Sequence, residues 1–191
     1  MTMKRLQAPF DGGCACGAVR YRMHALPLFV HCCHCTRCQR ETGSPFAHHA
    51  MIEFTALTLL QGEPDFVPVP TDSGSKHWVA RCGTCRSAMW NEHGTRKAII
   101  RYVRVGTLDE PTAFPPLAHI FTRSKQPWLA LSDDGKHYQT YYEVTEVWPI
   151  ASQMRYKAAE RARRRMPVVK LGGLMTPDAQ TTTEAGSRAA K

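Results

Sequence analysis

The chain has 191 residues, of which 43% are hydrophobic and 21% charged, and its formal net charge is +9. These proportions are typical of a globular domain and exclude a disordered chain. No apolar run is long enough to span a bilayer, and Met1–Gly13 lacks the apolar core of a secretory signal. We therefore expect a cytoplasmic protein with no membrane partner.

The positive charge lies mainly near the C-terminus. Residues 151–191 contain nine Lys/Arg and three Asp/Glu, a net charge of +6, whereas residues 1–150 carry +3. Because the body is nearly neutral, it presents no broad surface for a nucleic acid, and we expect none as a partner.

The first elements surround the cysteine-rich segments. Gly12–Gly17 is a glycine-punctuated turn with two cysteines, and Ala18–Met23 alternates in the manner of a half-buried strand. Leu26–Cys33 is predicted to be a second strand that ends in a cysteine cluster. Thr36–Thr42 is predicted to form one or two helical turns, which the following Gly-Ser-Pro ends.

Further strands are predicted at short intervals, with the Pro-, Gly- and Ser-rich segment Pro64–Ser75 as a connecting loop. They are Phe46–Phe54, Leu57–Gln61, Lys76–Arg81, Ala88–Asn91, Lys97–Leu108 and His119–Arg123. Many short strands with little helix predict a mainly β fold.

The C-terminal residues differ in composition from the body. Ala151–Met166 is predicted to form a basic helix, and Leu171–Lys191, rich in Thr, Ala and Gly, to be disordered. We therefore expect one folded domain at residues 10–149 and a basic extension at residues 150–191.

The eight cysteines fall into two pairs and one dense cluster. They are Cys14 and Cys16, Cys82 and Cys85, and the cluster Cys32, Cys33, Cys35 and Cys38. In a reducing compartment such spacing indicates metal ligands and not disulfides. Thiolate ligation without a need for redox chemistry favours zinc, and we expect two zinc ions per chain.

The two outer pairs are predicted to share one closed, tetrahedral zinc site. Cys14 and Cys16 would be joined to Cys82 and Cys85 across a long stretch of chain. Binding of this kind contributes folding free energy, on the order of 10 kcal/mol in small zinc modules. We expect this site to stabilise the fold by linking two distant segments of the chain.

The central cluster predicts a second site with three ligands, Cys33, Cys35 and Cys38. A fourth coordination position would then accept water or an incoming thiolate, as in catalytic zinc sites. Alternatively, Cys32 completes a closed site. In an extended segment Cys33 and Cys35 share a face and Cys32 points to the other, so we expect Cys32 not to be a ligand.

The histidines have no ligand spacing to the cysteines. His34 lies between two ligands and faces away from the metal, where it either orients the site or is an ordinary satisfied polar residue. We expect the remaining candidates to take no part in the chemistry: His48, His49, His77 and His93.

The cysteine motifs carry a specific resemblance. The chain resembles the glutathione-dependent formaldehyde-activating (GFA) enzyme family, which includes the centromere protein V type domain, over roughly residues 10–148. The residues that carry the resemblance are Gly13–Tyr21, Cys33–Arg40, Gly43–Phe46, Cys82–Cys85, Ala118–Ile120, Ser124, Lys125 and Trp128. The chain departs from the family at Arg86, where members often have glycine, and at Cys32. A non-glycine residue can adopt the left-handed conformation at a cost of about 1 kcal/mol.

This resemblance implies a compact β fold around zinc, related to methionine sulfoxide reductase B and to a Rab-binding zinc chaperone. It implies the same division of ligands into a structural and a catalytic zinc site. The implied activity is a carbon–sulfur lyase reaction in the direction of S-hydroxymethylglutathione formation, with glutathione or another small thiol and a small aldehyde as partners.

Two alternatives to this enzyme remain open at this point. The same site could hold a thiol without accelerating any reaction, as a glutathione- or thiol-binding zinc protein. Alternatively, the zinc sites could serve only as a scaffold, with the basic tail binding an acidic partner.

Overall fold

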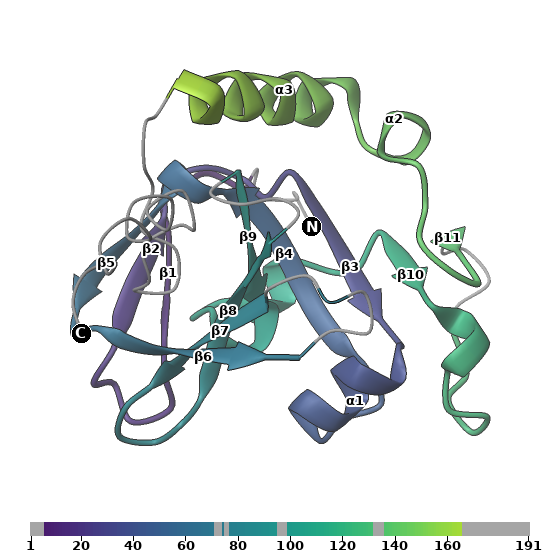
Figure 1. Ribbon diagram of the computed structural model, residues 1–191, viewed down its shortest axis with the longest axis horizontal. Helices are drawn as coiled ribbons and strands as arrows, with labels where there is room; N and C mark the ends of the chain where they lie inside the picture. Colours follow the sequence, from purple (N-terminus) through teal and green to yellow (C-terminus); the bar gives the residue numbers. More distant parts are fainter. Residues whose placement is uncertain (1–5, 71–73, 75–76, 95–98, 132–135, 166–191) are drawn as a thin grey trace, which may run out of the picture.

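The computed structural model describes residues 6–70, 74, 77–94, 99–131 and 136–165. Two β-sheets form most of it, as expected for a mainly β fold (Figure 1). The strands are β1 Phe10–Gly13, β2 Arg20–Met23, β3 Phe29–Cys33, β4 Ala47–Glu53, β5 Leu57–Gln61, β6 Pro64–Val69, β7 His77–Cys82, β8 Ala88–His93, β9 Ile100–Arg104, β10 Ala118–Ile120 and β11 Lys136–His137. The helices are α1 Thr36–Thr42, α2 Val144–Val147 and α3 Ile150–Arg165, with single 3₁₀ turns at Phe54–Ala56, Val105–Thr107, Pro111–Ala113 and Thr122–Ser124.

The larger sheet has eight strands in the order β11-β10-β3-β4-β9-β8-β7-β6, and the smaller sheet has the order β1-β2-β5. Neighbouring strands are antiparallel except at β10, which runs parallel to both β3 and β11. The chain passes from β4 through a 3₁₀ turn into β5 and so connects the two sheets. The smaller sheet packs on one face of the larger sheet, and the two sheets share one cluster of buried residues.

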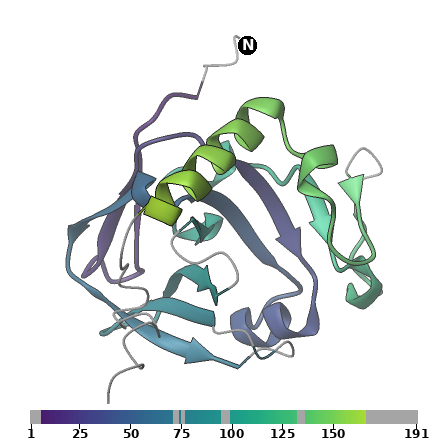
Figure 2. The same ribbon diagram turned by 45° about the horizontal axis from the view of Figure 1, so that its top comes forward.

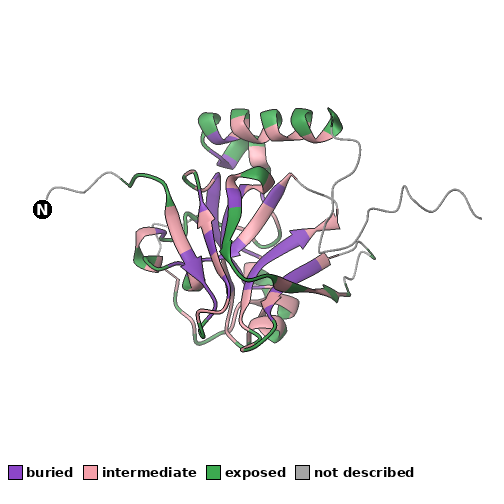
Figure 3. Ribbon diagram, turned by 90° about the vertical axis from the view of Figure 1, so that its left-hand side faces the viewer, coloured by how far each residue is buried: buried purple, intermediate pink, exposed green. Residues whose placement is uncertain are grey.

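The main core lies between the two sheets. Tyr21 of the smaller sheet packs edge-to-face on Trp90 of β8, with ring centroids 5.6 Å apart. Both side chains are almost completely buried, together with Ile52 and Val103 of the larger sheet. Figure 3 shows buried segments along the strands of the body. Burial of such aromatic and β-branched side chains is the main stabilising contribution in a fold of this size.

The C-terminal segment covers part of the opposite face. Trp148 stacks on Phe29 of β3 at 5.9 Å, and Tyr156 of α3 packs edge-to-face on Trp148. Helix α3 lies beyond the strand ends, where Arg155 makes a double hydrogen bond with Glu53 at the end of β4 (Figure 2). This basic helix is thus packed on the body through part of its surface.

Helix α1 is the short helix predicted after the cysteine cluster. Cys35 is its N-cap, with Sγ accepting a hydrogen bond from the Cys38 amide at 3.4 Å. Gly43 ends the helix in the left-handed conformation at φ 64°, which glycine adopts without strain. The predicted range of α1 and its end at Gly43 are therefore confirmed.

Three strands and one short helix were not expected from the sequence. β1 ends in the predicted glycine-rich turn, and β6 occupies the first part of the predicted loop Pro64–Ser75. The two-residue strand β11 and the single-turn helix α2 follow later in the chain. β6 contains two prolines, but it is an edge strand paired only with β7. An edge strand tolerates proline because an amide that points away from the sheet needs no partner.

The remaining differences concern element bounds. The strand expected at His119–Arg123 is β10 at Ala118–Ile120, followed by a 3₁₀ turn. The basic helix expected at Ala151–Met166 is α3. The disorder expected for Leu171–Lys191 lies outside the described residues, and the division at residues 149 and 150 stays a prediction. In the part of the chain that the structure describes, no helix combines the length and apolar composition needed to cross a bilayer.

Candidate functional site

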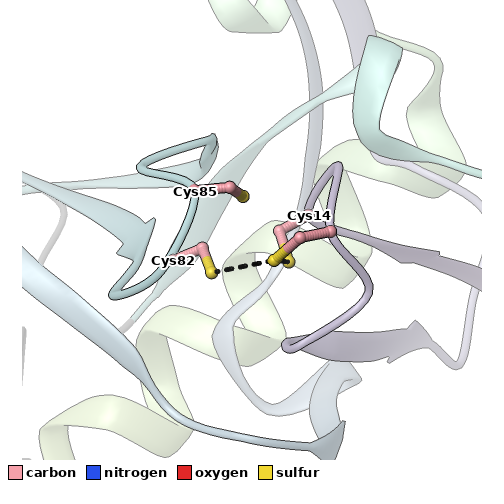
Figure 4. A group of neighbouring side chains, drawn as sticks. Cys14, Cys82 and Cys85 are labelled. Atoms are coloured by element: carbon pink, nitrogen blue, oxygen red, sulfur yellow. Dashed lines mark hydrogen bonds between the residues drawn. The ribbon is translucent and has the colours of Figure 1, made fainter.

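The first sulfur group joins the turn after β1 to the turn after β7. The sulfur atoms of Cys14, Cys16, Cys82 and Cys85 all lie within 4.8 Å of one another (Figure 4). Cys16 Sγ is 3.5 Å from Cys14 Sγ and 3.7 Å from Cys82 Sγ. Sulfurs about 3.8 Å apart are what four zinc–sulfur bonds of about 2.3 Å require in a tetrahedron. The group therefore fits a tetrahedral metal ion.

Backbone amides support this sulfur group. The Val19 amide donates to Cys14 Sγ at 3.3 Å, and the Thr84 amide donates to Cys82 Sγ at 3.4 Å. Such bonds favour a thiolate over a thiol. Arg86 closes the second turn at φ 62°, in the left-handed region expected at the position where the family often has glycine.

The second sulfur group forms where β3 gives way to α1. The sulfur atoms of Cys33, Cys35 and Cys38 also lie within 4.8 Å of one another. Hydrogen bonds from the Cys33 and Cys38 side chains lower the pKa of the Cys35 thiol. The pKa of the Cys33 thiol is raised by its own hydrogen bonds with Cys35 and Cys38 and by burial. The group therefore favours thiolate at Cys35 and could hold a metal ion through three sulfurs.

Cys32 lies outside both sulfur groups. It is 1% exposed, and burial raises the pKa of its thiol to about 12. It alternates with Cys33 along β3 and therefore projects from the other face of the sheet. The expectation that Cys32 points away from the cluster is confirmed.

His34 is a buried residue with several polar contacts. Its Nε2 lies 2.9 Å from His119 Nδ1, and its carbonyl oxygen accepts bonds from Gln39 Nε2 and Ser124 Oγ. His34 Nδ1, however, is buried without a hydrogen-bond partner among the described residues, so the simpler interpretation of His34 as a satisfied polar residue holds only for Nε2 and the carbonyl oxygen. The contacts of these two groups also tie the cysteine loop to the segment after β10.

The second sulfur group opens on a cavity of about 730 Å³. The cavity is enclosed by residues of the large sheet, of α1 and of the segment after β10. The lining residues are Cys33, Cys35 and Cys38, with His31, Thr36, Arg37, Glu41, His49, His77, Asn91, His93, Tyr102, Ile120, Phe121, Arg123, Ser124 and Tyr141. A concave site of this volume suits a small-molecule ligand.

The sheet residues of this cavity all belong to the face that carries Cys33. His31 is paired with His49 across β3 and β4, and Tyr102 is paired with Asn91 across β9 and β8. Because paired residues share a face, strands far apart in sequence contribute to one wall. His49, His77 and His93 were expected to have no role, since only the strand register brings them to the cavity.

A network of charged groups supports the cavity wall. Arg104 Nη1 donates to His49 Nε2 at 2.7 Å, and Arg104 Nη2 donates to Glu41 of α1. Arg81 also reaches Glu41, at 3.4 Å. Glu41 is thereby engaged by two guanidinium groups, and α1 is fixed to the sheet.

Burial keeps two of the cavity histidines, His49 and His77, neutral. Desolvation, with the nearby charge of Arg104, lowers the pKa of His49 well below its usual value. Desolvation and the neighbouring His93 lower the pKa of His77 to about 3. At neutral pH both rings therefore act as neutral hydrogen-bonding groups.

The sequence profile of the glutathione-dependent formaldehyde-activating enzymes matches residues 9–124, which include both sulfur groups. The chain belongs to the GFA family. The match ends at the segment that closes the cavity, so α2 and α3 lie outside the matched region of this GFA protein.

Other comparisons add little to the GFA assignment. No curated protein matches the chain. Solved structures similar to it include the crystal structure of a Rhodobacter sphaeroides protein, with 23% identity and a TM-score of 0.39. The match covers 52% of this chain and 87% of that chain.

Proposed function

We propose that this GFA protein is a zinc-dependent enzyme that joins glutathione and formaldehyde to S-hydroxymethylglutathione, or cleaves that adduct. The observation that carries the proposal is the placement of Cys33, Cys35 and Cys38 on the wall of a ligand-sized cavity. A three-sulfur group at a cavity wall suits a metal that must also accept a substrate.

We propose two zinc ions per chain, with different roles. Cys14, Cys16, Cys82 and Cys85 would hold a structural ion, because four sulfurs complete a tetrahedral shell. The cavity cysteines would hold a catalytic ion. When bound there, zinc supplies a Lewis-acidic position at which a thiol ionises near neutral pH.

Arg37 supports an anionic thiol as substrate. It lines the cavity from α1, and its buried Nη2 has no hydrogen-bond partner among the described residues. Arg123 lines the same cavity. A guanidinium group binds a carboxylate through two parallel hydrogen bonds, and glutathione carries two carboxylates. We assign carboxylate binding to these two residues.

The other walls would exclude water from the reacting groups. Tyr102, Phe121 and Tyr141 contribute aromatic surface to the cavity. Holding the thiolate sulfur and the aldehyde together in a partly dry site is the main source of rate acceleration, because the reaction joins two molecules. A reducing cytoplasm suits a protein whose eight cysteines are all unbridged.

The test is exchange between formaldehyde and glutathione, measured by NMR with and without the protein. We expect faster exchange with the native protein and no acceleration with Cys35→Ser, whose fold should survive. Equal rates with and without native protein would overturn the enzyme. Thiol binding without faster exchange would instead indicate a carrier of glutathione.

A further inference from the structure

His49 uses only one of its two ring nitrogens in the fold. Arg104 Nη1 lies 2.7 Å from His49 Nε2. A guanidinium group donates hydrogen bonds and accepts none, so Nε2 must be the acceptor. A neutral imidazole with Nε2 as acceptor carries its proton on Nδ1. The Arg104 contact therefore sets the tautomer of His49.

This arrangement leaves the Nδ1–H group of His49 without a hydrogen-bond acceptor in the described part of the chain. The atom is buried and has no hydrogen-bond partner among the described residues, and the whole residue is 4% exposed. An unsatisfied buried donor destabilises a fold, and most buried donors in native proteins have a hydrogen-bond partner. His49 lines the cavity, so a ligand there whose oxygen reached Nδ1 would supply the missing acceptor.

His49 is close to the second sulfur group. It is paired with His31 on the neighbouring strand, and Cys33 lies two residues beyond His31 on the same face. Diagonal neighbours of this kind on adjacent strands lie about 7–8 Å apart. A ligand atom bonded to a sulfur in the cavity is therefore within reach of the imidazole.

The orientation of the ring is coupled to the helix that carries the cysteines. Arg104 is buried and also bonds to Glu41, which follows Cys38 by three residues in α1. Arg104 thus links the imidazole and the cysteine loop through one rigid group. With its charge already balanced by Glu41, this site favours an uncharged ligand atom over a carboxylate.

We propose that His49 Nδ1–H donates a hydrogen bond to the oxygen of the aldehyde substrate, and that Arg104 is the positioning residue for it. The inference rests on the proposed function. The thiolate sulfur forms the new bond to carbon, and the π electron pair of the carbonyl moves to oxygen. That oxygen takes a proton from water, while the thiol proton has already left to water, so the adduct forms without an oxidant.

His49 keeps its own proton throughout this step. Its contribution is to stabilise the negative charge that develops on oxygen, and a fixed donor in a buried site does so effectively. A neutral imidazole suits this role, because its N–H group donates a hydrogen bond and keeps its proton near neutral pH.

Two substitutions separate the two ring nitrogens. His49→Gln retains an acceptor near Nε2 for Arg104 and removes the donor at Nδ1, whereas His49→Asn retains a donor near Nδ1. We expect His49→Gln to lower kcat about 100-fold with the KM for glutathione within twofold of native. His49→Asn should recover part of the loss. Equal kcat in the native protein and His49→Gln would overturn the inference while the proposed function stands.

A second measurement does not depend on turnover or on the variants. The Nδ1–H signal of His49 is observed by ¹H–¹⁵N NMR of the zinc-loaded protein. A mixture of formaldehyde and glutathione should shift this signal, whereas S-methylglutathione, which lacks the hydroxyl, should not. A shift without accelerated exchange would support the subsite and count against the enzyme; an identical response to both ligands would remove the subsite.

Discussion

Cys33 and Cys82 project from opposite faces of the same eight-stranded sheet. Cys82 packs in the core between the two sheets, whereas Cys33 belongs to the cluster on the other face. One sulfur group therefore lies where the two sheets are joined, and the other lies in a cavity. We expect substitutions in the two groups to have different consequences.

Loss of a ligand from the first group should destabilise the fold. Cys16→Ser changes an exposed side chain, so its effect should come from the metal and not from packing. We expect one zinc fewer by native mass spectrometry and a free energy of unfolding lower by several kcal/mol. Cys35→Ser should also lose one zinc but unfold near the native midpoint. Cys32→Ala is the control and should retain both ions.

Arg86 offers a test of backbone strain. Its left-handed conformation should be relieved in Arg86→Gly, which we expect to raise stability by up to about 1 kcal/mol. The substitution also removes an exposed ion pair with Asp65, which contributes little. Arg86→Ala loses the same ion pair and keeps the strain. Denaturant unfolding should therefore rank glycine above alanine, and the reverse order would contradict the strain.

Arg37 should determine affinity for an anionic thiol. Arg37→Ala is expected to raise the KM for glutathione about tenfold with little change in kcat, because it removes a charged hydrogen bond that binds substrate and transition state equally. Arg40→Ala is the matched control: it removes the same charge from an exposed position on α1. If both variants behave alike, general electrostatic attraction explains the effect.

The cavity histidines should remain neutral in mildly acidic solution. Folding lowers the pKa of His77 to about 3 and lowers the pKa of His49 well below its usual value, so the unfolded chain binds more protons below pH 6.5. These residues therefore contribute stability above pH 6.5 that is lost as the pH falls. Imidazole NMR signals of His49 and His77 should stay constant from pH 8 to pH 5, and titration within that range would contradict this burial effect.

The ion pair between Arg155 and Glu53 should hold α3 on the body. A double-mutant cycle with Arg155→Ala and Glu53→Gln should give a coupling energy of about 1 kcal/mol, since the pair is bidentate and partly buried. Hydrogen exchange in α3 should accelerate in both single variants. Lys157→Ala, on the exposed side of the helix, should leave exchange and stability unchanged.

Local signals in the sequence were sufficient for much of the fold. The C-terminal end of α1 follows from Gly43, and β5 follows from the composition of its segment. β6 was missed because its prolines are tolerated only at a sheet edge, and which strand lies at an edge depends on the whole topology.

The sequence by itself determined the two sulfur groups and the exclusion of Cys32. Close spacing limits which sulfurs can meet, and alternation along a strand is a local property of the backbone. Only the tertiary structure decided that His49 and Arg104 belong to the same cavity as Cys33. Their place depends on the pairing register of β3, β4 and β9, and a shift by one residue would turn each of these side chains to the opposite face.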